Sequence, residues 1–228
     1  MKIAMWSGPR NLSTAMMYSF GNRGDLLLWD EPFYAAYLDA IKIKHPMQAE
    51  ILAAGLTCPQ AVADQIAERG DGQFLKLMTF HMLDGFPMDW GRDCLHFHLI
   101  RHPAHVIASY AQKRESPTLE DIGFSAHLDI YRQFPGPVVS SYDIRQDPRG
   151  VLEKLCKALG LTFDPAMLSW PIGPKPYDGV WASHWYDAVH RSAGFAAAEG
   201  PLPVLEGREA ALCEVALPAY EAMAQHKI

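Results

Sequence analysis

Residues 6–14 read WSGPRNLST and follow a short apolar run, so a turn, an arginine and two hydroxyl side chains stand together. A buried strand that leads through such a loop into a helix commonly binds an anion, because the first N–H groups of the helix have no partner within it and the helix dipole favours negative charge there. Arg10 adds a forked cation. The stretch predicts a phosphate or sulfate site, with the helix beginning at Asn11 or Ser13. An ordinary capped helix beside a solvated Arg10 is the alternative.

This loop differs from the ATP-binding loop G-x-x-x-x-G-K-[ST]. Leu12 and Ser13 stand where that pattern has its last glycine and its lysine. The difference disfavours an ATPase, and it leaves open which anion the loop would hold.

The elements that must position these residues are expected from hydrophobic periodicity. Strands are expected at residues 2–7, 25–30, 73–80, 95–100 and 138–143. Helices are expected at residues 12–22, 33–43, 58–70, 104–114, 119–134 and 148–161. Apolar strands that alternate with helices predict a three-layer α/β/α fold around a mainly parallel five-stranded sheet. Ligands of such sheets bind beyond the carboxyl ends of the strands, which is where the polar residues of this chain gather.

A second stretch, LHFHLIRHPAHVIASY at residues 95–110, has Arg101 at a strand end, then a proline, then a helix with Ser109 eight residues after the arginine. This arrangement resembles the 3′-phosphate-binding motif of the sulfotransferase family. Residues 9–14, PRNLST, resemble the family's 5′-phosphosulfate loop, P-[KR]-S-G-[ST]-T. Residues 142–168 are similar to its Tyr-acidic pair, helix and Leu-Gly-Leu ending. The resemblance spans roughly residues 1 to 170.

The resemblance implies a P-loop NTPase-like fold, read as a single domain over residues 1–228 with a less regular C-terminal segment from about residue 170. It implies that a sulfuryl group moves from 3′-phosphoadenosine 5′-phosphosulfate to a hydroxyl or amine of a small-molecule acceptor, without a metal. Arg101 and Ser109 would bind the 3′-phosphate. The residues implied at the 5′ end of the donor are Pro9, Arg10, Asn11, Leu12, Ser13 and Thr14.

Catalysis would need groups near the leaving phosphate and the acceptor. Arg10 would stabilise charge that grows on the bridging oxygen. His81 is one candidate for the general base, since a histidine titrates near neutrality, and Glu31 is the other. Lys76 could neutralise the leaving phosphate, or it could extend from the strand end to solvent. His81 follows Lys76 by five residues, more than in many members of the family.

The late segment from residue 172 to residue 195 is rich in aromatic residues and poor in helix signal. In sulfotransferases a basic, glycine-containing loop near the C-terminus covers the 3′-phosphate, and Lys175 or Arg191 with Gly179 could do so here. The sequence departs from the family's R-K-G-x-x-G form. In the alternative reading, Trp181 and Trp185 pack one helical turn onto the core.

Composition excludes some classes of function. The 228 residues carry a formal net charge of −6, which gives no general attraction to nucleic acid. No apolar run approaches a membrane span, so a cytoplasmic protein is expected. The four cysteines have no paired spacing. A metal site built from His96, His98, His102 and His105 is disfavoured, because Arg101 lies among them.

Two other functions stay open. One is a P-loop small-molecule kinase, which would need Mg²⁺, and the other is a non-catalytic nucleotide-binding module of the same fold. The sequence does not identify the acceptor or the oligomeric state. Aromatic residues that could line an apolar acceptor pocket or belong to the core are Phe33, Tyr34, Tyr37, Phe80, Phe86 and Trp181.

Overall fold

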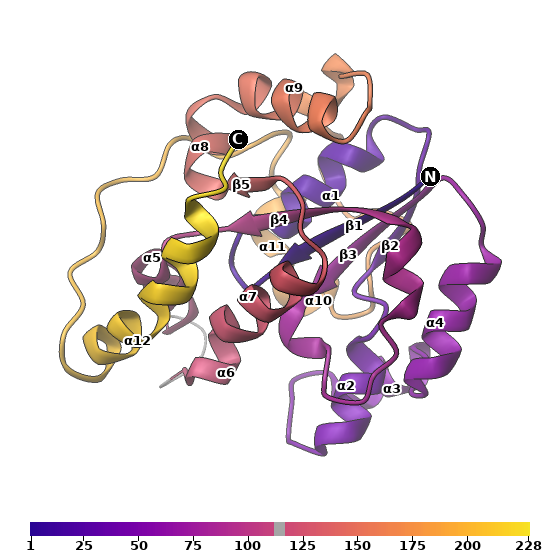
Figure 1. Cartoon of the computed structure of the whole chain (residues 1–228), viewed down its shortest axis with the longest axis horizontal. Coiled ribbons are helices and arrows are strands. Elements are labelled where there is room, and N and C mark those ends of the chain that lie inside the picture. Colours follow the sequence, from indigo (N-terminus) through magenta and orange to yellow (C-terminus); the bar gives the residue numbers. More distant parts are fainter. Residues whose placement is uncertain (112–116) are drawn as a thin grey trace.

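A single parallel sheet forms the centre of the molecule. The computed structural model describes residues 1–111 and 117–228, so the end of the helix expected at 104–114 lies outside the described residues. The strands run in the order β2-β3-β1-β4-β5, and every neighbouring pair is parallel (Figure 1). This confirms the α/β class and the five-stranded parallel sheet. The strands are β1 (Lys2–Ser7), β2 (Leu27–Asp30), β3 (Gln73–Met78), β4 (Cys94–Ile100) and β5 (Val138–Ser140).

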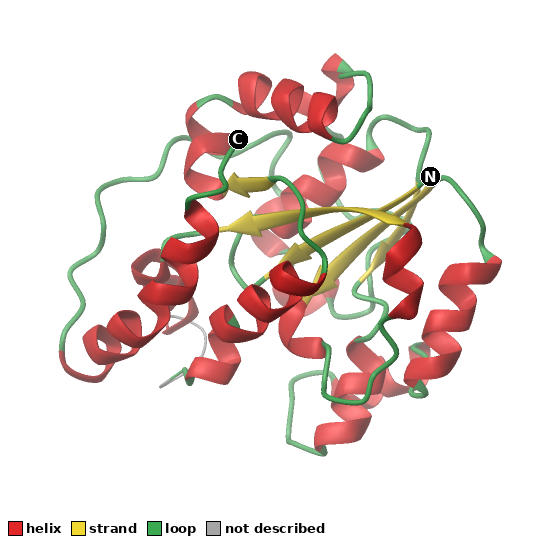
Figure 2. Ribbon diagram, viewed as in Figure 1, coloured by secondary structure: helices red, strands yellow, loops and turns green. Residues whose placement is uncertain are grey.

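Helices cover both faces of the sheet (Figure 2). Alternate residues of β1 enter different clusters. Ile3 and Met5 pack with α1 (Ser13–Gly21) and α9 (Pro148–Ala158), whereas Ala4 and Trp6 pack with α4 (Pro59–Glu68) and α7 (Phe124–Gln133). A strand buried on both faces reads as a continuous apolar run, which is why β1 could be predicted. The described helices are α1 (Ser13–Gly21), α2 (Tyr34–Ile41), α3 (Gln48–Ala54), α4 (Pro59–Glu68), α5 (Pro103–Ala111), α6 (Leu119–Ile122), α7 (Phe124–Gln133), α8 (Ser141–Gln146), α9 (Pro148–Ala158), α10 (Ala182–Trp185), α11 (Asp187–His190) and α12 (Gly207–Ala224).

Two expected elements are divided. The helix expected at 119–134 breaks into α6 and α7 at Gly123, whose φ of 67° is left-handed. The strand expected at 138–143 ends at Ser140, because the Ser140 side chain accepts a hydrogen bond from the N–H of Tyr142 and begins α8. Glycine accepts a left-handed conformation without steric cost, and serine is a favoured N-cap.

Five of the described helices were not expected: α3, α8, α10, α11 and α12. α3 lies beside α2, and α12 packs against α5 and α7. Pro218 lies inside α12, and proline is read as a helix breaker, so the sequence pattern hid this helix. Among the described residues, no helix combines the length and the apolar character needed to cross a membrane.

Candidate active site

A cavity of about 550 Å³ lies where the carboxyl ends of the strands meet the loops. Its volume is typical of a small-molecule or nucleotide site. Its lining contains no residue from positions 173–180, so Lys175 and Gly179 are not brought to it. The sequence-predicted residues that line it are Pro9, Arg10, Asn11, Leu12, Ser13, Thr14, Glu31, Lys76, His81, Arg101 and Ser109.

The loop between β1 and α1 has an unusual backbone. Arg10 and Leu12 are both left-handed, with φ of 60° and 73°, and Leu12 is the N-cap of α1. The helix begins at Ser13, one of the two expected starts, but no side chain caps it. The Asn11 amide instead donates to the carbonyl oxygen of Leu99 at 3.1 Å and ties the loop to β4. First-turn N–H groups that no side chain caps are suited to an anion.

The two predicted anion motifs lie in direct contact. Arg10 Nε donates a hydrogen bond to Ser109 Oγ at 3.1 Å, and Arg101 Nη1 donates one to the carbonyl oxygen of Arg10 at 2.8 Å. Burial lowers the pKa of both guanidinium groups from 12.5, yet both stay charged at neutral pH. The loops after β1 and β4 therefore present two cations at the same edge of the sheet.

The carboxylate of Glu199, a residue far along the chain, forms an ion pair with Arg101. Glu199 Oε1 is 2.7 Å from Arg101 Nε and 3.3 Å from Arg145 Nη1, and Glu199 Oε2 is 3.5 Å from His105 Nε2. The Glu199 side chain is only 2% exposed. An anion thus already lies beside the arginine for which the sequence predicts a phosphate.

Lys76 lies in a buried network instead of extending to solvent. Its ammonium donates to Asp30 Oδ1 at 2.8 Å, to Glu31 Oε1, and to Tyr186 Oη at 2.8 Å. Burial lowers its pKa, but the charges of Asp30 and Glu31 outweigh this and hold the pKa well above 10.5. All three ammonium donors have partners, so Lys76 can contact a leaving phosphate only by exchanging one of them.

His81 ends the 3₁₀ turn Thr79–His81 that follows β3, which stops at Met78. Its ring stacks against Tyr34 and Tyr37, with centroids 4.4 and 4.8 Å away. Neither ring nitrogen has a hydrogen-bond partner among the described residues. Burial, with the charge of Lys76 second, lowers the pKa of His81 well below 6.5, so the imidazole is neutral at pH 7 and able to accept a proton.

Glu31 lies close to His81, with 3.9 Å between Glu31 Oε2 and His81 Nδ1. Burial raises the pKa of Glu31 to about 7, with the charge of Asp30 acting in the same direction and Lys76 against it. Its φ of 43° is left-handed, and the following Pro32 restricts the turn. Both candidate bases therefore occupy the same end of the cavity.

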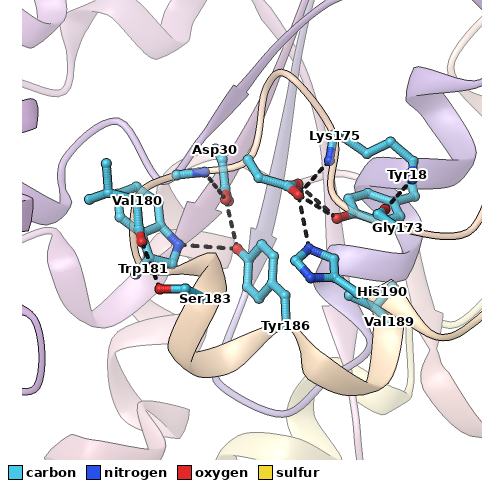
Figure 3. A network of polar contacts seen from close by, with 12 residues as sticks. Tyr18, Asp30, Gly173, Lys175, Val180, Trp181, Ser183, Tyr186, Val189 and His190 are labelled. Atoms are coloured by element: carbon cyan, nitrogen blue, oxygen red, sulfur yellow. Dashed lines mark hydrogen bonds and ion pairs between the residues drawn. The ribbon is translucent and has the colours of Figure 1, made fainter.

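Two buried carboxylates, those of Asp30 and Asp178, accept hydrogen bonds that fix the position of the C-terminal segment. Asp30 accepts hydrogen bonds from Tyr186 Oη at 2.7 Å and from the N–H of Gly179 at 3.2 Å (Figure 3). Asp178 accepts from Tyr18 Oη at 2.7 Å and from the N–H of Lys175 at 2.7 Å. The Lys175 ammonium donates to the carbonyl oxygen of Pro171 at 2.7 Å and to that of Gly173. These contacts explain why Lys175 and Gly179 lie outside the cavity lining.

The histidines of β4 have structural partners. His96 Nδ1 accepts from Trp6 Nε1 at 2.9 Å, and His98 contacts His127 and the carbonyl oxygen of Phe134. Within residues 1–111 and 117–228, no group of three or more histidine, cysteine, aspartate or glutamate side chains could hold a metal ion.

Comparison with known proteins identifies the family. A family model described as "Sulfotransferase domain" matches residues 1–227. The chain belongs to the sulfotransferase family.

Solved structures with the same fold include two sulfotransferase domains. One, from the curacin biosynthetic pathway, has a TM-score of 0.59 at 15% identity and covers 94% of this chain and 96% of its own. The other, from the olefin synthase of Synechococcus PCC 7002, has a TM-score of 0.51 at 18% identity and covers 94% of this chain and 93% of its own. At such low identity these likenesses show the fold of the sulfotransferase domain and nothing finer.

The curated relatives that the chain matches are named as aminotransferase-like proteins. The chain is 34% identical over 233 residues to branched-chain-amino-acid aminotransferase-like protein 1 of Arabidopsis thaliana, and 32% identical over 233 residues to protein 2 of that name. The match covers 98% of this chain but only 42% and 41% of those proteins. The sulfotransferase domain thus corresponds to about two fifths of each relative's length.

Aromatic residues of this sulfotransferase domain divide between cavity and core. Phe33 and Phe86 belong to the apolar cluster under α4. Trp181 and Trp185 both line the cavity, and Trp181 also packs into the core cluster of α1. The predicted aromatic residues that line the cavity are Tyr34, Tyr37, Phe80 and Trp181.

Sequence reasoning missed several residues of this site. Arg145 follows β5 and could have been found from its place after the carboxyl end of a strand. Tyr186 lies in the aromatic-rich late segment, where no local signal links it to Lys76 or Asp30. Glu199 lies in a segment without periodicity, and no local signal links it to Arg101.

Proposed function

We propose that this protein transfers a sulfuryl group from 3′-phosphoadenosine 5′-phosphosulfate to a hydroxyl or amine of a small-molecule acceptor. The proposal depends above all on one observation: the β1–α1 loop and the Arg101–Ser109 motif line one cavity and touch through the Arg10–Ser109 hydrogen bond. Both phosphate-bearing positions of the donor belong to the same ribose, so two adjacent cationic sites fit it.

Residues of the chain suit the ionised ends of this donor. N–H groups of the first turn of α1 have no side-chain cap, and Arg10 lines the same part of the cavity. When bound, the donor supplies an activated sulfuryl group on a 5′-phosphate. Arg10 and the loop N–H groups stabilise negative charge at that phosphate, and they act more strongly in the transition state, where this charge is greatest.

His81 is the proposed general base. Its two buried nitrogens lack partners, which is expected of a group whose partner is the acceptor hydroxyl or amine. Loss of the acceptor proton to His81 creates an imidazolium 3.9 Å from Glu31, and the Glu31 carboxylate stabilises that charge. Lys76 and Asp30 orient Glu31 and its turn. Tyr34, Tyr37 and Trp181 would contact an aromatic or aliphatic acceptor.

Thermal denaturation with ligands tests the proposal. A ligand that binds only the folded state at about 100 times its Kd adds about 2.7 kcal/mol, or roughly 5 to 10 °C in Tm for a domain of this size. Adenosine 3′,5′-bisphosphate should produce this shift, and Mg-ATP should not. The reverse result would favour the kinase. If the bisphosphate binds but is never formed from the donor with any acceptor, the protein is a binding module.

A further inference from the structure

Three basic side chains converge on one buried carboxylate beside the proposed donor site. This basic cluster consists of Arg101 at the end of β4, His105 on α5 and Arg145 on α8, and its carboxylate is that of Glu199. Two guanidinium groups share a single negative charge, so the cluster holds an excess of positive charge. The Glu199 carboxylate is held by ion pairs at 2.7 Å to Arg101, 3.3 Å to Arg145 and 3.5 Å to His105.

We propose that the basic cluster is the site of the donor's 3′-phosphate, and that Glu199 occupies it as an internal substitute until the nucleotide displaces it. This inference depends on the proposed donor. It adds Arg145 and His105 to the phosphate site and gives Glu199 a role that the sequence does not suggest.

Charge and geometry favour a phosphate monoester over the carboxylate. A phosphate monoester carries a charge of about −1.5 to −2 at pH 7 and has three acceptor oxygens, so it matches two guanidinium groups better than one carboxylate does. A carboxylate offers only two oxygens and one negative charge to these three basic groups, so it is a poorer ligand for the same donors.

The segment that carries Glu199 is weakly held. Residues 195–205, here called the strap, lead into α12 (Figure 1). Within the described part of the chain, no backbone hydrogen bond of the strap is found, and Leu202 and Val204 are 54% and 89% exposed. Segments with few backbone bonds and exposed side chains open at low free-energy cost. The strap can therefore leave the cluster while the sheet and its helices stay folded.

Competition by Glu199 should reduce the apparent affinity for the donor. A site that is free only part of the time binds with a Kd raised by the inverse of that fraction. Glu199→Gln keeps the size of the side chain and removes its charge. The matched control is Glu206→Gln, an exposed acid at the start of α12.

Calorimetric titration with adenosine 3′,5′-bisphosphate and with adenosine 5′-monophosphate provides the test. Glu199→Gln should bind the bisphosphate at least about tenfold more tightly than the wild type, with the monophosphate affinity unchanged and Glu206→Gln like the wild type. Arg145→Gln, introduced into the Glu199→Gln variant, should weaken the bisphosphate alone by about tenfold. Equal bisphosphate affinity in the wild type and Glu199→Gln would overturn the role of Glu199.

Limited proteolysis of the wild-type protein gives a second test that needs no variant. A glutamate-specific protease should cut after the buried Glu199 faster with the bisphosphate than without a ligand, and the monophosphate should not change the rate. Unchanged or slower cleavage after Glu199 with bound bisphosphate would overturn the displacement. If neither wild type nor Glu199→Gln binds the bisphosphate at all, the proposed donor is wrong, and the cluster assignment is wrong with it. The two failures are therefore distinguishable.

Discussion

Arg10 Nε and Ser109 Oγ lie 3.1 Å apart and join the β1–α1 loop to helix α5, although the two residues are 99 positions apart in sequence. This contact places the cation of the β1–α1 loop beside the last turn of α5. The proposed donor site depends on this adjacency, because a single nucleotide must reach both the β1–α1 loop and the Arg101–Ser109 motif.

The 3′-phosphate motif can be tested by selectivity. Arg101→Ala should weaken adenosine 3′,5′-bisphosphate by about 10- to 100-fold, since a hydrogen bond to a charged group contributes about 1.5 to 3 kcal/mol. Ser109→Ala should have a smaller effect, about fivefold. Adenosine 5′-monophosphate should be affected little in either variant, as calorimetry would measure. Equal weakening of both nucleotides would contradict the assignment.

Arg10 is expected to act in the transition state. Arg10→Ala should lower kcat by about 10² to 10³, in line with the loss of one preorganised oxyanion donor, and should change the Kd of the donor much less. Single-turnover kinetics and equilibrium binding separate the two effects. Arg10→Lys, which keeps the charge but loses the fork and the Ser109 contact, is the matched control. A Kd that rises as much as kcat falls would show that Arg10 only binds.

Activity should depend on pH through Glu31. Because the pKa of Glu31 is raised to about 7 by burial, its carboxylate is protonated at pH 6 and ionised at pH 8. The ionised form is needed beside His81, so kcat/KM should rise with pH through about 7. His81 stays neutral over this range, since its pKa lies well below 6.5.

Two variants separate the roles of these groups. Glu31→Gln should remove the pH step and leave reduced activity, while His81→Ala should abolish activity and keep bisphosphate binding. Retained activity in His81→Ala, with loss in Glu31→Gln, would make Glu31 the base.

Asp30 should matter for stability as well as for the site. Asp30 and Lys76 are each 1% exposed at the side chain, so Asp30→Asn leaves a buried ammonium with less compensation. Breaking a buried ion pair costs about 3 to 5 kcal/mol. Asp39→Asn is the control, since Asp39 is 45% exposed in its pair with Lys42 and should cost less than about 1 kcal/mol. Urea denaturation measures both. A loss below about 1 kcal/mol in Asp30→Asn would contradict the importance of the network.

Local pattern determined most of the fold. The buried strands are apolar runs of the right length, and helices such as α4 and α9 separate apolar from polar residues along one face, so their type and order are local properties of the chain. α12 escaped prediction because Pro218 and its weak periodicity mask it. The break between α6 and α7 at Gly123 was not predicted, because a single glycine within an amphipathic pattern is usually tolerated inside a helix.

Only the tertiary structure decided how the candidate site is completed. Arg10, His81, Arg101 and Ser109 could be named from the sequence, because each follows a strand whose carboxyl end must face the same edge. The sequence could not show that Lys175 lies outside the cavity, or that Glu199 forms an ion pair with Arg101. Those positions depend on Asp178, on Asp30 and on the path of an irregular segment across the sheet edge. Contacts between residues so distant in sequence follow from packing of the whole chain, and no periodicity encodes them.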